Sequence, residues 1–101
     1  MTPEGKIKKL VKQTIESYFP VSYRFMPVQN GMGIPGLDFF YCIHGRFVAI
    51  ETKAPGNKPT ARQLQTFTQI KRAGGLAYVV DSQETLNAVM DDLVMIPCQS
   101  L

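Results

Sequence analysis

The pattern of apolar and polar residues predicts seven elements in the order helix, three strands, helix, strand, helix. Apolar residues recur at helical spacing, with charged residues between them, in residues 3–19, 61–73 and 82–93. Apolar runs or alternating segments of strand length occupy residues 21–28, 37–43, 46–53 and 76–80. The order favours one α/β domain spanning residues 1–101, α-β-β-β-α-β-α, with a mixed β-sheet flanked by helices on both faces.

Local signals add detail to three of these elements. Thr2 and Pro3 suit the N-cap and the first position of the first helix. The second helix is expected to begin after Thr60 and to bury Leu64, Phe67 and Ile70. The run 76–80 is continuously apolar, which is typical of an interior strand. The tail 94–101 suits either an edge strand or a subunit contact, and the sequence does not choose between them.

The segment 37–53 predicts a β-hairpin that turns at His44 and Gly45, because glycine readily adopts the positive φ of a tight turn. In that register the numbers of facing residues sum to 89, so Asp38 faces Glu51, and Lys53 lies on the same face. A turn shifted by one residue keeps all three on one face. The many aromatic and aliphatic neighbours, with Cys42 among them, predict a hairpin that is largely buried on both faces.

Two facing carboxylates require an explanation. At about 5 Å they repel by around 3 kcal/mol at an effective dielectric constant near 20. Protonation or a hard divalent cation with oxygen ligands, such as Mg²⁺, relieves that repulsion. Lys53 can complement the charge or hold a water or a phosphate oxygen. A plainer interpretation also stays open, in which Asp38 is a turn residue and Glu51 and Lys53 form an exposed pair on an edge strand.

Composition narrows the class of partner. The chain has 45% hydrophobic residues, a net charge of +3 and a pI near 9.0, which favours a polyanionic partner. Two Cys and one His are too few for a disulfide scaffold or a zinc site. No apolar run reaches the length of a membrane span, so we expect a cytoplasmic location without a membrane partner.

Two loops contain residues suited to binding a ligand. Gly31, Gly33 and Gly36 have the spacing of a dinucleotide-binding loop, but Pro35 and a strand follow where that loop requires a helix. We therefore expect no nucleotide cofactor, and interpret these glycines as a turn or as a close approach to a phosphate chain. Lys58 and Arg62, near the start of the second helix, are candidate contacts to a nucleic-acid backbone, although lone basic residues on loops are usually only solvated.

The motifs resemble the small stand-alone endonucleases of the VRR-NUC family, in the PD-(D/E)xK nuclease superfamily. Asp38 is followed after twelve residues by Glu51-Thr52-Lys53, and Thr60-Ala61-Arg62-Gln63 then leads into a helix that ends at Ala73-Gly74-Gly75. The resemblance spans roughly residues 3–82. One position departs from the family pattern, because Leu37 directly precedes Asp38 where the family usually has proline.

The resemblance implies a restriction-endonuclease-like core and a Mg²⁺- or Mn²⁺-dependent endonuclease that hydrolyses DNA. It places Asp38, Glu51 and the Thr52 carbonyl on the metal and makes Lys53 catalytic. It places Gln63 beside the metal-bound water or the phosphate, whereas a capping bond to Thr60 is the plainer role. Glu4 is the position that matches an acidic residue on the family's first helix, although it also suits a helix start by its charge.

The resemblance also implies branched DNA, such as a four-way junction, as the substrate, and a homodimer with two-fold symmetry. A competing interpretation is a non-catalytic nucleic-acid-binding module of the same fold. Two buried acids facing a polyanion disfavour it, because binding alone does not need them. A small structural or assembly protein is a third interpretation, and it predicts affinity for neither metal nor DNA.

Overall fold

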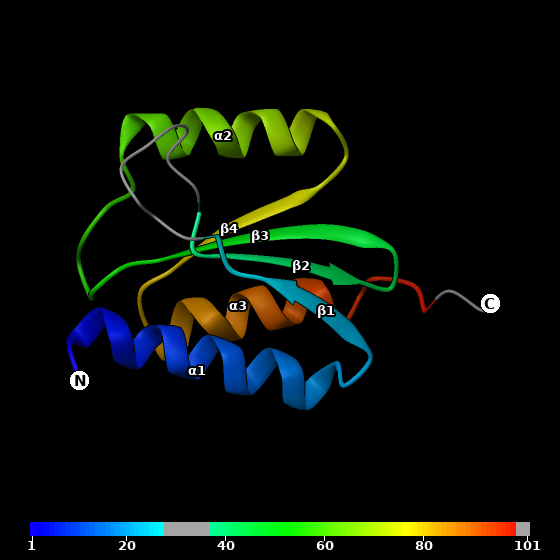
Figure 1. Ribbon diagram of the computed structural model, residues 1–101, viewed down its shortest axis with the longest axis horizontal. Helices are drawn as coiled ribbons and strands as arrows, with labels where there is room; N and C mark the ends of the chain where they lie inside the picture. Colours follow the sequence, from blue (N-terminus) through cyan, green and yellow to red (C-terminus); the bar gives the residue numbers. More distant parts are fainter. Residues whose placement is uncertain (28–36, 99–101) are drawn as a thin grey trace.

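The computed structural model describes residues 1–27 and 37–98, which form a four-stranded sheet between two layers of helices (Figure 1). The elements are α1 (Pro3–Tyr18), β1 (Ser22–Phe25), β2 (Phe39–Ile43), β3 (Arg46–Thr52), α2 (Ala61–Arg72), β4 (Leu76–Val80) and α3 (Gln83–Leu93). The predicted fold class and element order are confirmed. The three glycines of the loop and residues 99–101 lie outside the described residues, and with them the expectations placed on that loop and on the end of the tail.

The sheet has the order β1-β2-β3-β4, with antiparallel pairing up to β3 and a parallel pair between β3 and β4. The predicted hairpin register is confirmed, since Phe39 faces Ile50 and the facing numbers sum to 89. His44 and Gly45 form the loop with φ values of 50° and 79°. Positive φ at both positions is what a two-residue turn with the twist of the flanking strands requires.

The strand β4 lies at an edge of the described sheet, so its prediction as an interior strand is wrong. Its apolar sequence has another cause. The helix α2 packs against one face of β4 and α3 against the other, so both faces of an edge strand are covered (Figure 1). The continuously apolar sequence of β4 therefore indicates that both of its faces are covered. It does not indicate that β4 lies in the interior of the sheet.

Each helix begins at a capping residue, as the sequence predicts for Thr2 and Thr60. Thr2 Oγ1 accepts a hydrogen bond of 3.0 Å from the Gly5 N–H, and Pro3 occupies the first turn of α1. Thr60 begins α2 and Ser82 begins α3, each with a reciprocal capping box. No helix within residues 1–27 and 37–98 has the length and apolarity needed to cross a membrane.

The two faces of the sheet carry cores of different size. On the face toward α1 and α3 the core comprises Ile7, Val11, Ile15, Phe19, Phe39, Tyr41, Ile43, Val48, Ile50, Val80, Leu86, Val89, Met90, Leu93 and Ile96. On the face toward α2 it comprises Leu37, Ala49, Phe67 and Ala77. The small side chains of Ala49 and Ala77 let α2 approach the sheet closely.

The hairpin and α2 are less buried than the sequence suggested. Cys42 is exposed, and Phe47 is 47% exposed on the same sheet face as Ala49. Among the described residues, α2 is the helix on that face, and it packs against β4 and not against β1 or β2. Leu64 is 49% exposed, whereas Gln63 is buried, so the predicted buried stripe of α2 is wrong at Leu64.

Candidate active site

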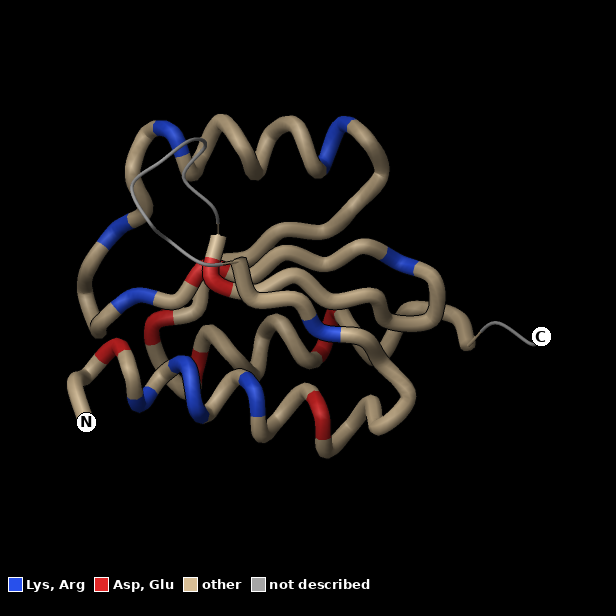
Figure 2. Tube along the Cα trace, in the orientation of Figure 1, with Lys and Arg blue, Asp and Glu red and all other residues tan. Residues whose placement is uncertain are grey.

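Asp38 and Glu51 meet at the end of the hairpin that is remote from its turn. The Asp38 N–H donates a hydrogen bond of 3.1 Å to Glu51 Oε1, which fixes the two residues side by side. Figure 2 shows acidic positions gathered where the strands end between α1 and α2, with basic positions along the segment that leads into α2. The structure thus brings the two acids together, as the hairpin register predicted.

Asp38 is held in place by Thr52, the last residue of β3. Asp38 Oδ2 accepts a hydrogen bond of 2.9 Å from the Thr52 N–H and one of 2.6 Å from the Thr52 hydroxyl. Burial acts to raise the pKa of Asp38, but these two bonds, with smaller contributions from Glu51 and Lys8, outweigh it and lower that pKa. Asp38 is therefore ionised at neutral pH.

Glu51 is the most buried of the candidate acids, with 4% of its surface exposed. Its Oε2 lies 3.2 Å from Lys53 Nζ and accepts a hydrogen bond from Gln63 Nε2. Burial and the negative charge of Asp38 raise the pKa of Glu51 from 4.5 to about 7, although Lys53 acts in the opposite direction. The pair consequently keeps its last proton on Glu51 until the pH reaches the neutral range.

Gln63 forms the predicted capping box with Thr60, and its side chain also reaches the acid pair. Its Oε1 accepts a hydrogen bond of 2.9 Å from the Thr60 N–H, and its own N–H donates a bond of 3.2 Å to Thr60 Oγ1. The amide nitrogen of the same side chain donates to Glu51 Oε2. The capping box therefore orients the amide so that its donor faces the site.

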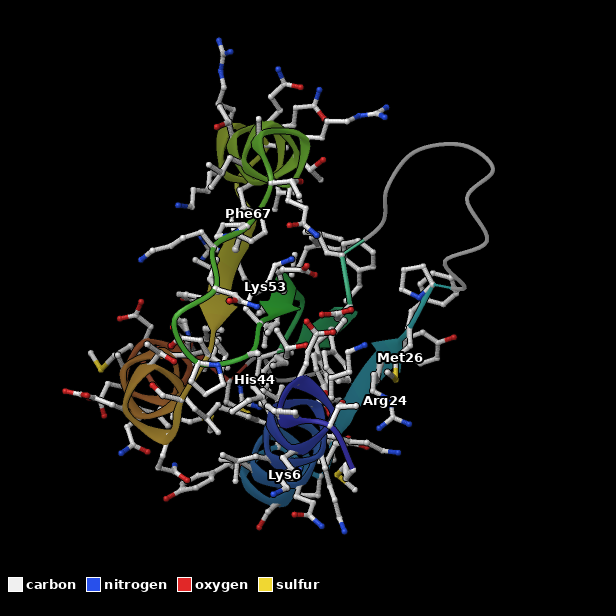
Figure 3. The ribbon with its side chains drawn as sticks, turned by 90° about the vertical axis from the view of Figure 1, so that its left-hand side faces the viewer. Lys6, Arg24, Met26, His44, Lys53 and Phe67 are labelled. Carbon is white, nitrogen blue, oxygen red and sulfur yellow. The ribbon has the colours of Figure 1, made fainter. Side chains whose placement is uncertain are left out.

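Lys53 lies between the two helix layers. In Figure 3 it lies in the central region of the molecule, below Phe67 of α2 and above α1. Its side chain is 17% exposed, so the ammonium group is shielded yet reaches solvent. A charged donor in such a position can hold a phosphate oxygen or a water molecule next to Glu51.

Glu4 lies on the first turn of α1 and is connected to the acid pair through a lysine. Lys8 Nζ lies 3.6 Å from Glu4 Oε2 and 3.4 Å from Asp38 Oδ1. The Glu4 side chain is 41% exposed, and that of Asp38 is 14% exposed. The ammonium group of Lys8 thus stands between the two carboxylates.

The remaining predicted residues lie further out. Lys58 is exposed on the loop before α2, and Arg62 is exposed in the first turn of α2. Neither makes an ion pair with an acidic side chain of the described residues. Both therefore face solvent on the segment that follows the acids.

The donor set at this site fits a hard divalent cation. Within the described part of the chain, Asp, Glu, His and Cys side chains do not converge in groups of three, so Asp38 and Glu51 form the acidic centre. Mg²⁺ characteristically binds one or two carboxylates and completes its shell with water and substrate phosphates. The raised pKa of Glu51 reflects its burial and the negative charge of half-buried Asp38, and such a cation would relieve that repulsion.

Sequence reasoning missed two contacts. Lys8 was assigned no role, although its spacing of four residues from Glu4 on one helix face is the signal for an ion pair. Thr52 was expected to contribute only its carbonyl, whereas its hydroxyl and N–H both bind Asp38. The position of Thr52 directly after an acid in a predicted strand does not indicate that its hydroxyl and N–H bind a second carboxylate.

Comparison with known proteins supports the resemblance predicted from the sequence. No family model matches the chain. The chain is 29% identical over 82 residues to the "Putative nuclease p44" of Acyrthosiphon pisum secondary endosymbiont phage 1, covering 80% of this chain and 85% of that protein. A solved structure described as "VRR_NUC domain" matches 90% of this chain and 97% of its own, with a TM-score of 0.75 and 20% identity. The chain therefore has the fold of a VRR-NUC domain, and the predicted resemblance is confirmed.

Proposed function

We propose that this chain is a VRR-NUC family nuclease, a metal-dependent endonuclease that hydrolyses phosphodiester bonds of DNA. One observation carries the proposal: Asp38, Glu51 and Lys53 converge at the end of one hairpin, with Gln63 bonded to the same carboxylate. The fold and the likeness to a phage protein named as a nuclease support it.

Asp38, Glu51 and the Thr52 carbonyl are the groups that would hold Mg²⁺ or Mn²⁺, and Glu4 is a candidate for a second ion or an outer-shell water. Such an ion, when bound, lowers the pKa of a water and offsets negative charge on the phosphate. The hydroxyl and N–H of Thr52 fix Asp38 before any ligand arrives. This preorganisation reduces the ordering that binding requires.

Lys53 and Gln63 act on the reacting groups. Lys53 donates from its ammonium group to the attacking water or to a phosphate oxygen, because it lies beside Glu51 and is largely shielded from solvent. Gln63 keeps its amide donor at Glu51 through the capping box. The water oxygen bonds to phosphorus as the bond from phosphorus to the 3′ oxygen breaks. The products are a 5′-phosphate and a 3′-hydroxyl, whose oxygen takes up a proton.

Glu51→Ala and Lys53→Ala are expected to abolish cleavage, a loss on the order of a thousandfold or more, because each removes a group that acts directly at the reaction centre. The measurement is cleavage of labelled DNA with Mg²⁺ and with EDTA, alongside circular dichroism for the fold. Lys9→Ala, an exposed change on α1, is the matched control. Full Mg²⁺-dependent cleavage by Glu51→Ala protein would refute the proposal. DNA binding without cleavage by the wild type would favour the non-catalytic module.

The proposal extends to the DNA surface. All eleven Lys and Arg residues lie in residues 1–75, whereas residues 76–101 carry four Asp and Glu and no basic residue. Lys58 and Arg62 lie on the segment between the acids and α2, so we assign them contacts to the DNA backbone.

We extend the proposal further to branched DNA and a homodimer. A four-way junction presents two equivalent strands, and a two-fold dimer would place one site on each. The open β1–β2 side of the sheet supports an interface, since Tyr23 and Phe25 are 69% and 54% exposed there. Aromatic residues without charge are typical of interface cores. Mass measurement by light scattering, with cleavage of junction, flap, nicked and linear DNA, tests both extensions; a monomer that cuts all four equally would refute them.

A further inference from the structure

Lys8 is a second ammonium group at the acid pair, and it lies next to Asp38, whereas Lys53 lies next to Glu51. Lys8 Nζ lies 3.4 Å from Asp38 Oδ1, and Lys53 Nζ lies 3.2 Å from Glu51 Oε2. The two lysines come from different elements, α1 and the end of β3, so each carboxylate of the pair has its own cationic neighbour.

The contacts of Lys8 are loose. Its two ion pairs, to Asp38 and to Glu4, measure 3.4 Å and 3.6 Å, which is longer than a well-formed charged hydrogen bond. Its side chain is 37% exposed, about twice the value for Lys53. Asp38 is already fixed by two shorter bonds from Thr52. Lys8 is therefore not needed to hold Asp38, and its ammonium group remains available to a ligand.

The charges at the site indicate which ligand the ammonium group of Lys8 can bind. The acid pair of Asp38 and Glu51 contacts Lys8 and Lys53, and Glu4 shares Lys8 from α1, so with all five groups ionised the net charge is −1 and disfavours a phosphate. A divalent cation beside the acids makes the cluster positive. The attraction of Lys8 to Asp38 then weakens, and a phosphate oxygen becomes its best partner.

We propose that Lys8 binds a phosphate oxygen of the substrate DNA at the catalytic site, and that it serves as the counterion of Asp38 and Glu4 when DNA is absent. The inference rests on the proposed nuclease function and adds a substrate-binding residue to it. Lys8 beside Asp38 and Lys53 beside Glu51 then both contact the DNA. If Lys8 only positioned Asp38, its loss would weaken binding of the metal and leave the affinity for DNA unchanged. This contrast gives the test its direction.

The test compares Lys8→Met with Lys8→Arg and with Lys9→Met, an exposed change on the same helix. Binding to a labelled four-way junction is measured with Ca²⁺ in place of Mg²⁺ over a range of salt concentrations. Lys8→Met should weaken binding about five- to tenfold and reduce the salt slope by about one, as loss of one phosphate contact does. Lys8→Arg should stay near the wild type, and Lys9→Met within about twofold.

A second measurement follows Mn²⁺ binding without DNA by calorimetry. Lys8→Met should bind Mn²⁺ as tightly as the wild type or more tightly, because a competing positive charge is gone. Unchanged DNA affinity and salt slope, or weaker Mn²⁺ binding together with lower thermal stability, would overturn the inference. If the wild type binds no Mn²⁺ and cuts no DNA, the proposed function itself fails. If the wild type does both, a negative result concerns Lys8 alone.

Discussion

The two faces of β3 differ in what covers them, and neighbouring residues show the contrast. Ile50 points toward α1 and α3 into a core of large side chains and is fully buried. Glu51 points to the face covered by α2, where the core is small, and is nearly as buried. Two helices close one face with apolar contacts, whereas a single helix leaves the strand ends of the other face to polar groups. Burial of similar extent therefore serves stability on one face and the proposed catalytic site on the other.

The largest expected effect on stability concerns the apolar face. Ile50→Ala should lower the free energy of unfolding by about 2–5 kcal/mol, because it leaves a cavity in the larger core. Urea denaturation followed by circular dichroism measures the change. The site residues themselves are untouched, so cleavage by the folded fraction should persist. A loss below 1 kcal/mol would mean that this face is packed less tightly than the burial of Ile50 indicates.

At the neighbouring position, Glu51, a substitution is expected to raise the free energy of unfolding. The pKa of Glu51 is raised to about 7 in the folded state from an ordinary value of 4.5, so the folded state holds the proton more tightly than the unfolded chain does. Stability is therefore lost as the pH rises from about 4.5 through 7. Glu51→Gln, which stays neutral, should stabilise the protein at pH 8 by up to about 3 kcal/mol.

Denaturation in EDTA at pH 4 and at pH 8 measures this difference. The advantage of Glu51→Gln should disappear at pH 4, where Glu51 is protonated in both states. Mg²⁺ should stabilise the wild type at pH 8 and have little effect on the variant, because binding to the folded state alone raises stability. A variant that is less stable than the wild type at pH 8 would contradict the assignment of Glu51 as a strained acid.

The smallest expected effects on stability are those of substitutions at Gln63 and Leu64, which are adjacent residues of α2. Gln63→Ala removes the bonds to Thr60 and Glu51 and should lower stability by about 1–2 kcal/mol. Leu64→Ala should stay within about 0.5 kcal/mol, since Leu64 is 49% exposed. Thermal unfolding of the two variants in parallel measures the difference. A reversed ranking would mean that Leu64 is covered in solution, as by a second subunit.

Much of the fold follows from local rules that the sequence states directly. Gly45 fixes the turn, and the turn fixes the register that brings Asp38 beside Glu51. Thr60 begins α2 by the same kind of local signal. These features need only residues within a few positions of each other, or one strand pairing, so periodicity and turn chemistry were sufficient to predict them.

The missed features depend on how distant elements pack. The contact of Lys8 with Asp38 exists because α1 crosses the end of the hairpin, and no spacing in the sequence encodes that crossing. Leu64 is exposed because α2 turns Gln63 toward Glu51, where a hydrogen bond compensates the burial of an amide. Cys42 is exposed because one helix covers only part of its face. Apolar pattern alone cannot say which half of a sheet face a helix will shield.

The side chain of Gln63 has a consequence beyond the chemistry of the site. It closes the first turn of α2 through Thr60 and touches Glu51 with its remaining donor. A change of charge on Glu51 alters the hydrogen bond that Gln63 donates at the strand end. The same side chain forms the capping box, so the change also affects the beginning of α2. Glu51 lies twelve residues before Gln63, so one side chain connects the N-terminal turn of α2 to the end of β3.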